Sequence, residues 1–324
     1  MTGVLRSRLM RAIDAPLCAH WLLSGLVVSQ AIAGNLNAQI AELLIQEQIK
    51  VLAIEEFLLS SGHWICRAVG VSGFVATGLF DTQLAAPEPF FLAKLLDRDA
   101  AGAAVFLAPQ EIGQGNANGG LDLVVEYMQG GWDLEDPLWR GVLTIGHAAY
   151  VKYHRGYRLR RALQEYWTKH ADMFVTAGYR PLENFELSRE QLSGLALRFD
   201  TRRTLCYSDG TGPPGQTVSN AFHYAAPLCG FTPAEQRVLL KAADGLTDQE
   251  IADDLHASVN SIKQAWRTIY TRVEAYAPSV FSDNDAREKN GKRGNEKRRR
   301  VIAFVVEHPQ ELRPYFYEGR RRRA

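Results

Sequence analysis

Apolar residues recur at helical spacing between residues 231 and 273. Positions three and four apart fall on one face of a helix, so they mark the side that packs against the rest of the protein. Three such faces follow one another: Val238, Leu239 and Ala242; Ile251, Ala252 and Leu255; Val259, Ile262, Trp266, Ile269 and Val273. The pattern predicts three consecutive helices, of which the last is the longest.

Helix-capping residues stand just before each of these faces. Thr232 is followed three residues later by Glu235, Thr247 is followed in the same way by Glu250, and Ser258 precedes the third face. A Thr with a Glu three positions further on can satisfy two backbone N–H groups at the start of a helix. The sequence therefore predicts a helix-turn-helix, with short helices that meet at tight corners.

The free face of the third predicted helix carries amides, hydroxyls and cations. Lys and Arg suit guanine edges and phosphates, whereas Asn and Gln suit adenine edges in the major groove. With three arginines of a later basic segment, the candidate DNA-binding residues are Ser258, Asn260, Ser261, Lys263, Gln264, Arg267, Thr271, Arg272, Arg298, Arg299 and Arg300. This face predicts sequence-specific contact with double-stranded DNA.

The same stretch resembles the DNA-binding domain of the LuxR/FixJ transcription factors. The matching positions are Thr232, Glu235, Gly245, Glu250, Ile251, Ala252, Leu255, Ser258, Lys263 and Ile269. Ala265 stands where that family usually has His, which removes one phosphate contact. The resemblance implies a helix-turn-helix regulator. A sigma-factor region-four module and a helical trio inside another kind of domain remain alternatives.

The charge of the chain is concentrated at its C-terminal end. The whole chain has a net charge of +1, but residues 287–324 carry +8 and residues 1–286 carry −7. Residues 295–308 have the pattern of a basic helix, which we expect either to replace the family's fourth helix or to pack on the front domain. Arg298, Arg299 and Arg300 would then lie beside DNA phosphates.

The front half of the chain mixes helical and strand-like patterns. Residues 37–59 carry apolar residues at helical spacing and predict one long amphipathic helix, whereas residues 64–80 are rich in Val, Gly and Phe, as strands are. The fold class expected is α+β. An N-terminal α/β sandwich, with a sheet and helices as in PAS, GAF or autoinducer-binding domains, precedes an all-α helix-turn-helix domain and a basic C-terminal helix.

Five parts follow from these patterns. We expect N-terminal helices that could mediate dimerisation in residues 1–60, a sensor-like domain in 61–205 and a linker in 206–227. The DNA-binding domain would cover 228–278 and a basic tail 279–324. The apolar stretch 15–33 is too short and too interrupted to span a bilayer.

A candidate ligand site lies in residues 121–140. Tyr127 and the Asp136-Pro137 pair keep a spacing found in acyl-homoserine-lactone-binding domains, which this segment resembles, and Trp132 and Trp139 could enclose an acyl group or a ring. The resemblance implies that Asp136 accepts a ligand N–H and that Tyr127 holds a carbonyl. The alternative is that the tryptophans are core residues and that Asp136 caps a helix with Pro137 at its first position.

Two further patterns carry weaker signals. Residues 153–161 are basic and aromatic, which indicates a solvated helix face or a dimer contact, with nucleic-acid contact as a further alternative. The cysteines Cys18, Cys66, Cys206 and Cys229 lie far apart, so we expect free buried thiols in a reducing compartment. No cofactor and no metal site are expected.

These patterns together predict a cytoplasmic transcriptional regulator of the LuxR type that is not an enzyme. Its expected partners are double-stranded DNA, RNA polymerase and a second copy of the chain, and a small-molecule effector is a further candidate; no membrane contact is expected. The alternative function is a ligand-independent DNA-binding accessory protein whose front domain binds a protein partner. A hidden enzyme in residues 1–200 ranks third, because the sequence displays no nucleophile–base pair.

Overall fold

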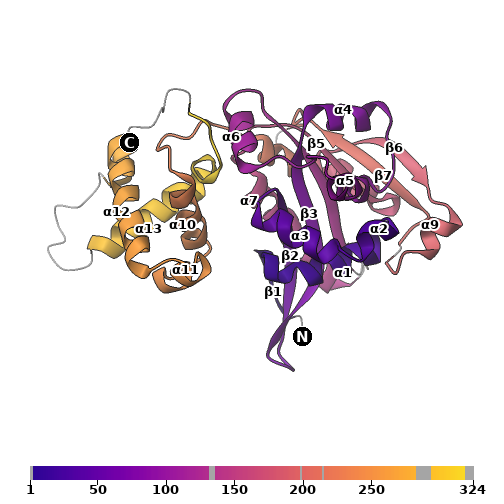
Figure 1. Cartoon of the computed structure of the whole chain (residues 1–324), viewed down its shortest axis with the longest axis horizontal. Coiled ribbons are helices and arrows are strands. Elements are labelled where there is room, and N and C mark those ends of the chain that lie inside the picture. The colour runs from indigo at the N-terminus through magenta and orange to yellow at the C-terminus, as the bar shows by residue number, and fades with distance from the viewer. Residues whose placement is uncertain (1–2, 131–135, 198, 214, 282–292, 318–324) are drawn as a thin grey trace.

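One mixed seven-stranded sheet forms the centre of the structure, a computed structural model that describes residues 3–130, 136–197, 199–213, 215–281 and 293–317 (Figure 1). The strand order is β1-β2-β3-β4-β5-β7-β6. The strands are β1 (Val4–Leu9), β2 (Ile49–Leu58), β3 (His63–Val75), β4 (Leu121–Gly130), β5 (Leu159–Trp167), β6 (Arg180–Glu186) and β7 (Arg202–Ser208). Every neighbouring pair is antiparallel except β4 and β5.

A helix and a strand occupy residues 37–59, where one long helix was predicted. Helix α3 (Leu36–Ile45) ends early, Glu47 has a positive φ of 56°, and β2 begins at Ile49. In β2, Val51 and Leu52 point to opposite faces of the sheet and join different apolar clusters. Because both faces of this strand are covered, its apolar residues do not alternate with polar ones, and the run could not be told from a helix by its pattern.

The parallel pair β4–β5 is the exception in the sheet. Pairing runs from Leu121 and Leu159 to Glu126 and Glu165, and β4 then continues to Gly130. An irregularity in the β3–β4 ladder lies beside this point, where Val71 faces Glu126 but Val69 faces Gln129. A bulge of this kind bends its strand. Among the described residues, the β4–β5 ladder ends at the pair Glu126 and Glu165.

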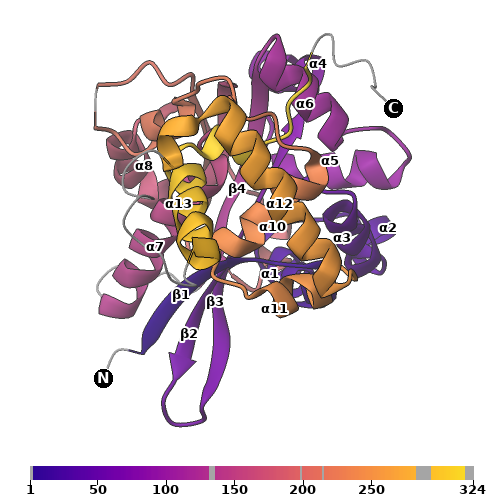
Figure 2. The same cartoon turned by 90° about the vertical axis from the view of Figure 1, so that its left-hand side faces the viewer.

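Helices cover both faces of the sheet (Figures 1 and 2). Helices α1, α3 and α5 bury their apolar residues against one face, and α6, α7, α8 and η3 cover the other. These and the remaining helices of this part are η1 (Ala12–Asp14), α1 (Ala15–Gly25), α2 (Gln30–Ala33), α3, α4 (Thr77–Ala85), α5 (Phe91–Ala100), α6 (Pro109–Ala117), α7 (Pro137–His154), η2 (Thr168–His170), α8 (Ala171–Ala177), α9 (Arg189–Ser193) and η3 (Val218–Phe222).

A helical unit follows, made of α10 to α13 with η4. Its members are α10 (Pro233–Ala243), α11 (Asp248–Asp254), α12 (Val259–Tyr276), η4 (Pro278–Phe281) and α13 (Arg293–Glu307), and η5 (Pro309–Leu312) comes after it. The capping boxes predicted at Thr232 and Thr247 are confirmed, as is the cap at Ser258, whose Oγ accepts from Ser261 N at 3.0 Å. Val301 and Val305 of α13 complete its core.

The expected fold class is wrong, because the front part is a seven-stranded mixed sheet between two helical layers and the helices behind it do not form a separate all-α domain. Arg11, before α1, donates to Asp254 of α11 at 2.6 Å, and Lys152 of α7 donates to Asp244 at 2.8 Å. Asn116 of α6 donates to the carbonyl of Pro314 at 2.7 Å. These contacts join the helical unit to elements on both sides of the sheet.

The division of the chain into five parts stays a prediction. Residues 1–60 contribute β1 and β2 to the central sheet as well as helices, and the expected linker 206–227 contains the end of β7 and η3. Helix α13 coincides with the helix expected at 295–308. Within the described ranges, no helix combines the length and the apolar character needed to cross a bilayer.

Candidate active site

A cavity lies between the sheet and α7 on the face that α7 covers. Its floor is one cross-strand row, because Lys50 of β2 pairs with Ser72 of β3, Ser72 with Val125 of β4, and Val125 with Gln164 of β5. The cavity volume is about 50 Å³, and all four residues line it. The floor thus crosses the sheet to the parallel pair β4–β5.

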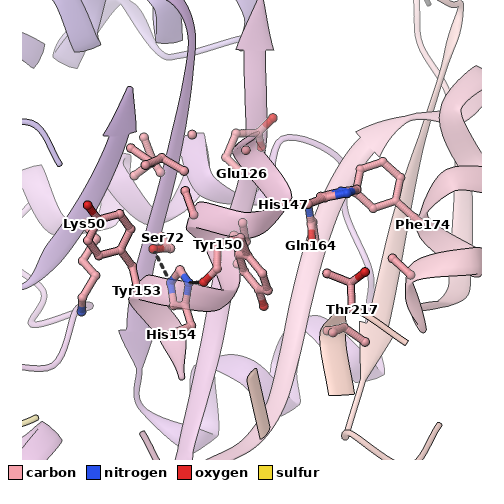
Figure 3. Close-up of a pocket in the computed structure, with 18 of the residues that line it drawn as sticks. Lys50, Ser72, Glu126, His147, Tyr150, Tyr153, His154, Gln164, Phe174 and Thr217 are labelled. Atoms are coloured by element: carbon pink, nitrogen blue, oxygen red, sulfur yellow. Dashed lines mark hydrogen bonds between the residues drawn. The ribbon is translucent and has the colours of Figure 1, made fainter. Parts of the chain in front are cut away.

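Helix α7 forms the opposite wall because β4 and β5 run parallel and need a crossover connection. Gly146 and Ala149 of α7 line the cavity, and their lack of a large side chain leaves space above the floor. Further along, α8 and η3 close the cavity with Phe174 and Val218. The aromatic and aliphatic walls make the cavity mostly apolar, with a few polar groups aimed into it (Figure 3).

Ser72 and His154 form a buried pair on this cavity. The hydroxyl Oγ of Ser72 lies 2.8 Å from Nε2 of His154, and Nδ1 of His154 lies 2.8 Å from the carbonyl oxygen of Tyr150 (Figure 3). A carbonyl can only accept, so Nδ1 carries the proton and Nε2 of the neutral ring accepts the Ser72 hydroxyl. Both side chains are 5% exposed. The backbone of α7 therefore fixes the tautomer that lets His154 take a proton from Ser72.

The surroundings keep His154 neutral. Burial, together with the charges of Lys50 and Arg313, lowers the pKa of His154 to about 3, although the hydrogen bond to the Tyr150 carbonyl acts in the opposite direction. The imidazole is consequently unprotonated throughout the physiological range. It is always able to accept a proton, but it is a weak base.

A second polar pair lies further along the cavity. The hydroxyls of Tyr150 and Tyr179 are 3.0 Å apart, and both residues line the cavity. Burial raises the pKa of Tyr150 to about 12, so its phenol is protonated and can donate a hydrogen bond. His147, one turn before Tyr150, also lines the cavity, and burial lowers its pKa. These groups can bind a carbonyl or hydroxyl in an otherwise apolar space.

Lys50 supplies the positive charge of the floor. Its Nζ lies 4.6 Å from the ring centre of Tyr157 and 5.2 Å from that of Phe74. Lys50 lies directly opposite Ser72 on the antiparallel strands β2 and β3, and its charge acts on His154, the partner of Ser72. A negative oxygen formed there would be stabilised by this charge.

The far face of the sheet is closed behind the cavity by a buried ion cluster. Arg203 of β7 pairs with Glu126 of β4 and with Glu165 of β5, each at 2.6 Å. Both backbone N–H groups of Phe90 and Phe91 donate to the Glu165 carboxylate at 2.9 Å. This cluster holds β4, β5 and β7 together at the point where the β4–β5 pairing ends.

The geometry matches one class of chemistry. A hydroxyl bonded to an imidazole whose second nitrogen is held by a fixed acceptor is the arrangement of nucleophilic catalysis, in which the base is oriented by a third group. An apolar cavity with convergent polar groups is the usual setting for a substrate. No group of three or more metal-ligating side chains occurs in the described part of the chain.

Two of the four predicted ligand residues, Asp136 and Trp139, lie outside the described lining of the cavity. Asp136 caps α7, with its Oδ1 accepting from Leu138 N at 2.8 Å and Pro137 at the first position, as the alternative interpretation proposed. Trp139 packs in an apolar cluster beside β1. Neither is a described lining residue of the cavity. Tyr127 is on β4, and Trp132 lies outside the described residues, so a ligand role for these two stays a prediction.

The predicted DNA-binding residues fall into two groups. On α12 and its cap, the exposed ones are Ser258, Asn260, Ser261, Lys263, Gln264, Arg267 and Thr271. The remaining four are arginines held in ion pairs within the helical unit: Arg272 with Glu235, Arg298 with Asp248, and both Arg299 and Arg300 with Glu296. Arg298 also lies over the ring of Trp266, at 4.9 Å from its centre.

The pairing of Ser72 with His154 was not predicted from the sequence, although Tyr150 and Tyr153, which line the cavity, belong to a group of aromatic residues that could enclose a ligand. The basic segment 153–161 was expected to face solvent or a partner, but Tyr153, His154 and Tyr157 are buried. The alternation of basic and aromatic residues at the end of a helix was the available signal, since only one side of that turn faces water. No local sequence pattern indicated a catalytic role for Ser72, because its partner His154 lies 82 residues further along the chain.

Comparisons with known proteins give similarity at the level of solved structures alone. No protein-family model matches the chain, and no curated protein matches it. The C-terminal condensation domain of Ebony, in complex with beta-alanyl-dopamine, is 13% identical, with 64% of this chain and 99% of that chain covered and a TM-score of 0.35.

Two other solved structures show comparable similarity. FeeM, an N-acyl amino acid synthase from uncultured soil microbes, is 10% identical, with 68% of this chain and 99% of that chain covered and a TM-score of 0.35. An aminoglycoside acetyltransferase in complex with coenzyme A is 10% identical, with 67% and 98% covered and a TM-score of 0.31. Similarity this low does not establish a family for the chain.

These findings correct the functional predictions. The recognition as a LuxR/FixJ-type regulator is wrong, because the front part is a seven-stranded mixed sheet that differs from the expected sensor domain and the helices behind it are joined to that part by direct contacts. Both predicted DNA-binding functions, the regulator and the accessory protein, are contradicted on the same grounds. The expectation that the protein is not an enzyme is wrong as well, and DNA and RNA polymerase are not supported as partners.

Proposed function

We propose that the protein is an enzyme of acyl transfer, with Ser72 as nucleophile and His154 as its base. The observation that carries the proposal is the 2.8 Å contact of Ser72 Oγ with Nε2 of a histidine whose tautomer is fixed by the Tyr150 carbonyl. It lies on a cavity that can hold a substrate beside it. The proposal does not rest on the low similarity to solved structures.

The first half-reaction moves the acyl group to the enzyme. Ser72 Oγ attacks the carbonyl carbon of an ester or thioester donor, and its proton passes to Nε2 of His154. The new C–O bond gives a tetrahedral oxyanion, which the Lys50 ammonium stabilises. As the oxyanion collapses, the bond to the leaving oxygen or sulfur breaks, and His154 returns the proton to that atom. The product is an acyl ester of Ser72.

The second half-reaction releases the acyl group. An amine, a hydroxyl or water loses its proton to His154 and attacks the ester carbonyl, and Ser72 leaves as a hydroxyl after taking the proton back. The Tyr150–Tyr179 pair binds a polar atom of the substrate further along the cavity. The cavity is small, with a volume of about 50 Å³, and its walls are mostly apolar. We therefore infer short acyl groups as substrates.

Coenzyme A, which the aminoglycoside acetyltransferase binds, would meet a negative charge at the described N-terminal end of α7. The N-terminus of α7 follows β4, and such helix ends bind phosphates through their free N–H groups. Here the Asp136 carboxylate accepts from Leu138 N, and Pro137 has no N–H to offer. Because a carboxylate occupies this helix end, no step above passes through coenzyme A, and the donor is recognised through its acyl part.

The proposal is tested by turnover of simple donors. We would measure release of nitrophenol or thiol from acetyl, butyryl and octanoyl esters and thioesters by the full chain, with hydroxylamine as acceptor. Replacing the nucleophile in Ser72→Ala is expected to lower the rate on the order of 10³-fold or more. Ser208→Ala is the matched control, since Ser208 is equally buried on β7 but does not line the cavity.

Two results would contradict the proposal. One is equal turnover by Ser72→Ala and Ser208→Ala. The other is the lack of any turnover by the unmodified chain above the uncatalysed rate with all donors. A preference for acetyl and butyryl over octanoyl groups is the expected consequence of the small cavity.

We also infer a reducing compartment such as the cytoplasm. Cys18, Cys66, Cys206 and Cys229 are all free, and three of them are buried. Burial raises the pKa of Cys18 and of Cys229 to about 12, which keeps these thiols protonated and unreactive. Four unpaired cysteines are typical of a reducing environment.

A further inference from the structure

A C-terminal strap, residues 309–317, crosses from the helical unit to the layer that contains the cavity. On the helical side, the Glu311 carboxylate accepts from the backbone N–H groups of Leu228 and Cys229 at 2.5 and 3.1 Å. Gln236 of α10 donates to the carbonyls of Glu311 and Arg313 at 3.1 and 2.6 Å. The first half of the strap is therefore fixed to the helical unit.

The second half of the strap is fixed to the sheet part. The carbonyl of Pro314 accepts from Asn116 at 2.7 Å, and Phe316 N donates to the carbonyl of Gly113 at 3.0 Å. Both partners belong to α6. Between the two anchored halves lies Arg313, which is 5% exposed.

Arg313 caps the C-terminal end of α7. Its Nε donates to the carbonyl of Arg155 and its Nη2 to the carbonyl of Lys152, both at 3.0 Å, and its guanidinium lies 4.8 Å from the ring centre of Tyr157. The last carbonyls of a helix lack intrahelical partners, and a cation there is favourable. His154 is the last residue of α7, so it lies between two carbonyls that Arg313 holds.

The strap also packs closely on the turn after α7. Gly156 has a φ of +89°, and a Cβ at this residue would lie 2.5 Å from Gln310 N and 2.6 Å from the carbonyl carbon of Pro309. Only glycine permits this approach. A methyl group at Gly156 would push the strap away from the turn that carries His154.

We infer that the strap is part of the catalytic site and that Arg313 is a positioning residue, which holds the last turn of α7 so that His154 faces Ser72. This inference rests on the proposed function. It assigns to the helical unit a role in catalysis, since the strap is fixed on that unit. The active site is then complete only when the helical unit is docked on the sheet part.

The charged and titratable groups around this junction are few. His154 faces Lys50 of β2 and Arg313 of the strap, with Ser72 and the Tyr150 carbonyl as hydrogen-bond partners. Arg313 in turn faces Tyr153 and Tyr157, and Asp244 of the helical unit. Removing the Arg313 charge takes away one of two cations that oppose protonation of His154. The pKa of His154 is then expected to rise.

The experiment compares Arg313→Lys and Arg313→Gln with the unmodified full chain. For a positioning residue, we expect Arg313→Gln to lower kcat roughly 10-fold to 100-fold with little change in KM. Arg313→Lys keeps the charge but lacks the planar guanidinium that donates to the two carbonyls, so it should restore part of the lost kcat. Heteronuclear NMR of the His154 ring, which needs no turnover, should show a higher pKa in Arg313→Gln and a pKa closer to the original in Arg313→Lys.

A second pair of variants covers the case in which Arg313→Gln fails to fold. Gly156→Ala is expected to lower kcat in the same range, whereas Gly62→Ala, also at a positive φ of +69° but with nothing within 4 Å, should not. Unchanged kcat in folded Arg313→Gln, or in Gly156→Ala if the first variant does not fold, would overturn the inference. If the unmodified chain has no turnover, the proposed function is contradicted. If the pKa of the His154 ring measured by NMR is the same in the Arg313 variants and in the unmodified chain, the strap does not act on His154, and the inference about the strap is contradicted separately.

Discussion

The two ends of α7 are closed in different ways. At the N-terminal end, Asp136 and Pro137 are neighbours in sequence, and the Asp136 carboxylate caps the helix with a negative charge. At the C-terminal end, the cap is Arg313, which lies 158 residues from Arg155, whose carbonyl it holds. One end is set by local sequence, and the other depends on the docking of a distant segment.

This difference explains why the proposed catalytic base, His154, lies at the C-terminal end of α7 and not at its N-terminal end. A helix N-terminus with its own carboxylate is a poor site for another anion, and the residues there serve the fold. The C-terminal end is buried, touches the floor of the cavity and carries His154. Because its cap comes from the strap, the orientation of His154 depends on the docking of the helical unit on the sheet part. The orientation of Asp136 depends only on the first turn of α7.

The largest expected effect is on the pH dependence of the free energy of unfolding, and it arises from His154 at the C-terminal end of α7. Burial depresses the pKa of His154 from its usual 6.5 to about 3, so His154 contributes stability above pH 6.5 that is lost as pH falls toward 3. One such proton changes the free energy of unfolding by about 1.4 kcal/mol per pH unit. We expect His154→Gln to flatten the loss between pH 6.5 and 5 by about 2 kcal/mol in urea unfolding.

The control for this measurement is an exposed histidine. His63→Gln, on the β2–β3 hairpin, is the control variant, because His63 is exposed. His147 and His170 also have lowered pKa values, so part of the pH dependence remains in His154→Gln. Parallel curves for His154→Gln and the unmodified chain would show that His154 is not held neutral by the fold.

A smaller effect is expected at the other end of the helix. Asp136→Ala removes the N-cap bond to Leu138 N and should lower the free energy of unfolding by about 1 kcal/mol at pH 7. Turnover should stay within about twofold, because Asp136 is not among the described residues that line the cavity and its cap bond is made in the first turn of α7. A loss of turnover as large as that of Arg313→Gln would remove the distinction between the two ends.

The parts of the fold that could be predicted are those set by short-range interactions. The caps at Thr232, Thr247 and Ser258 involve residues three positions apart, and all three were predicted correctly. The sheet was not, because β2 is covered on both faces and its apolar residues satisfy a helical pattern as well. Strand order and the parallel pair β4–β5 depend on contacts between distant segments, which no local pattern records.

The candidate site was not predictable for the same reason. Ser72 and His154 are joined by a sheet register and a helix crossover, and each residue alone is ordinary in its segment. The caps of the helical trio, in contrast, fit a well-known DNA-binding pattern so well that function was inferred from them. Caps and an apolar face specify how helices begin and pack, and they carry no information on what the exposed face contacts.

The proposed function depends on the formation of an acyl ester on Ser72. The full chain would be mixed with acetyl and butyryl thioesters, quenched in acid, and analysed by intact-mass and peptide mass spectrometry, with Ser72→Ala and Ser208→Ala alongside. We predict a single acyl adduct on the peptide that contains Ser72, present in Ser208→Ala and missing in Ser72→Ala. No adduct on Ser72 under conditions in which the chain turns over the donor, or an adduct that persists in Ser72→Ala, would contradict the account.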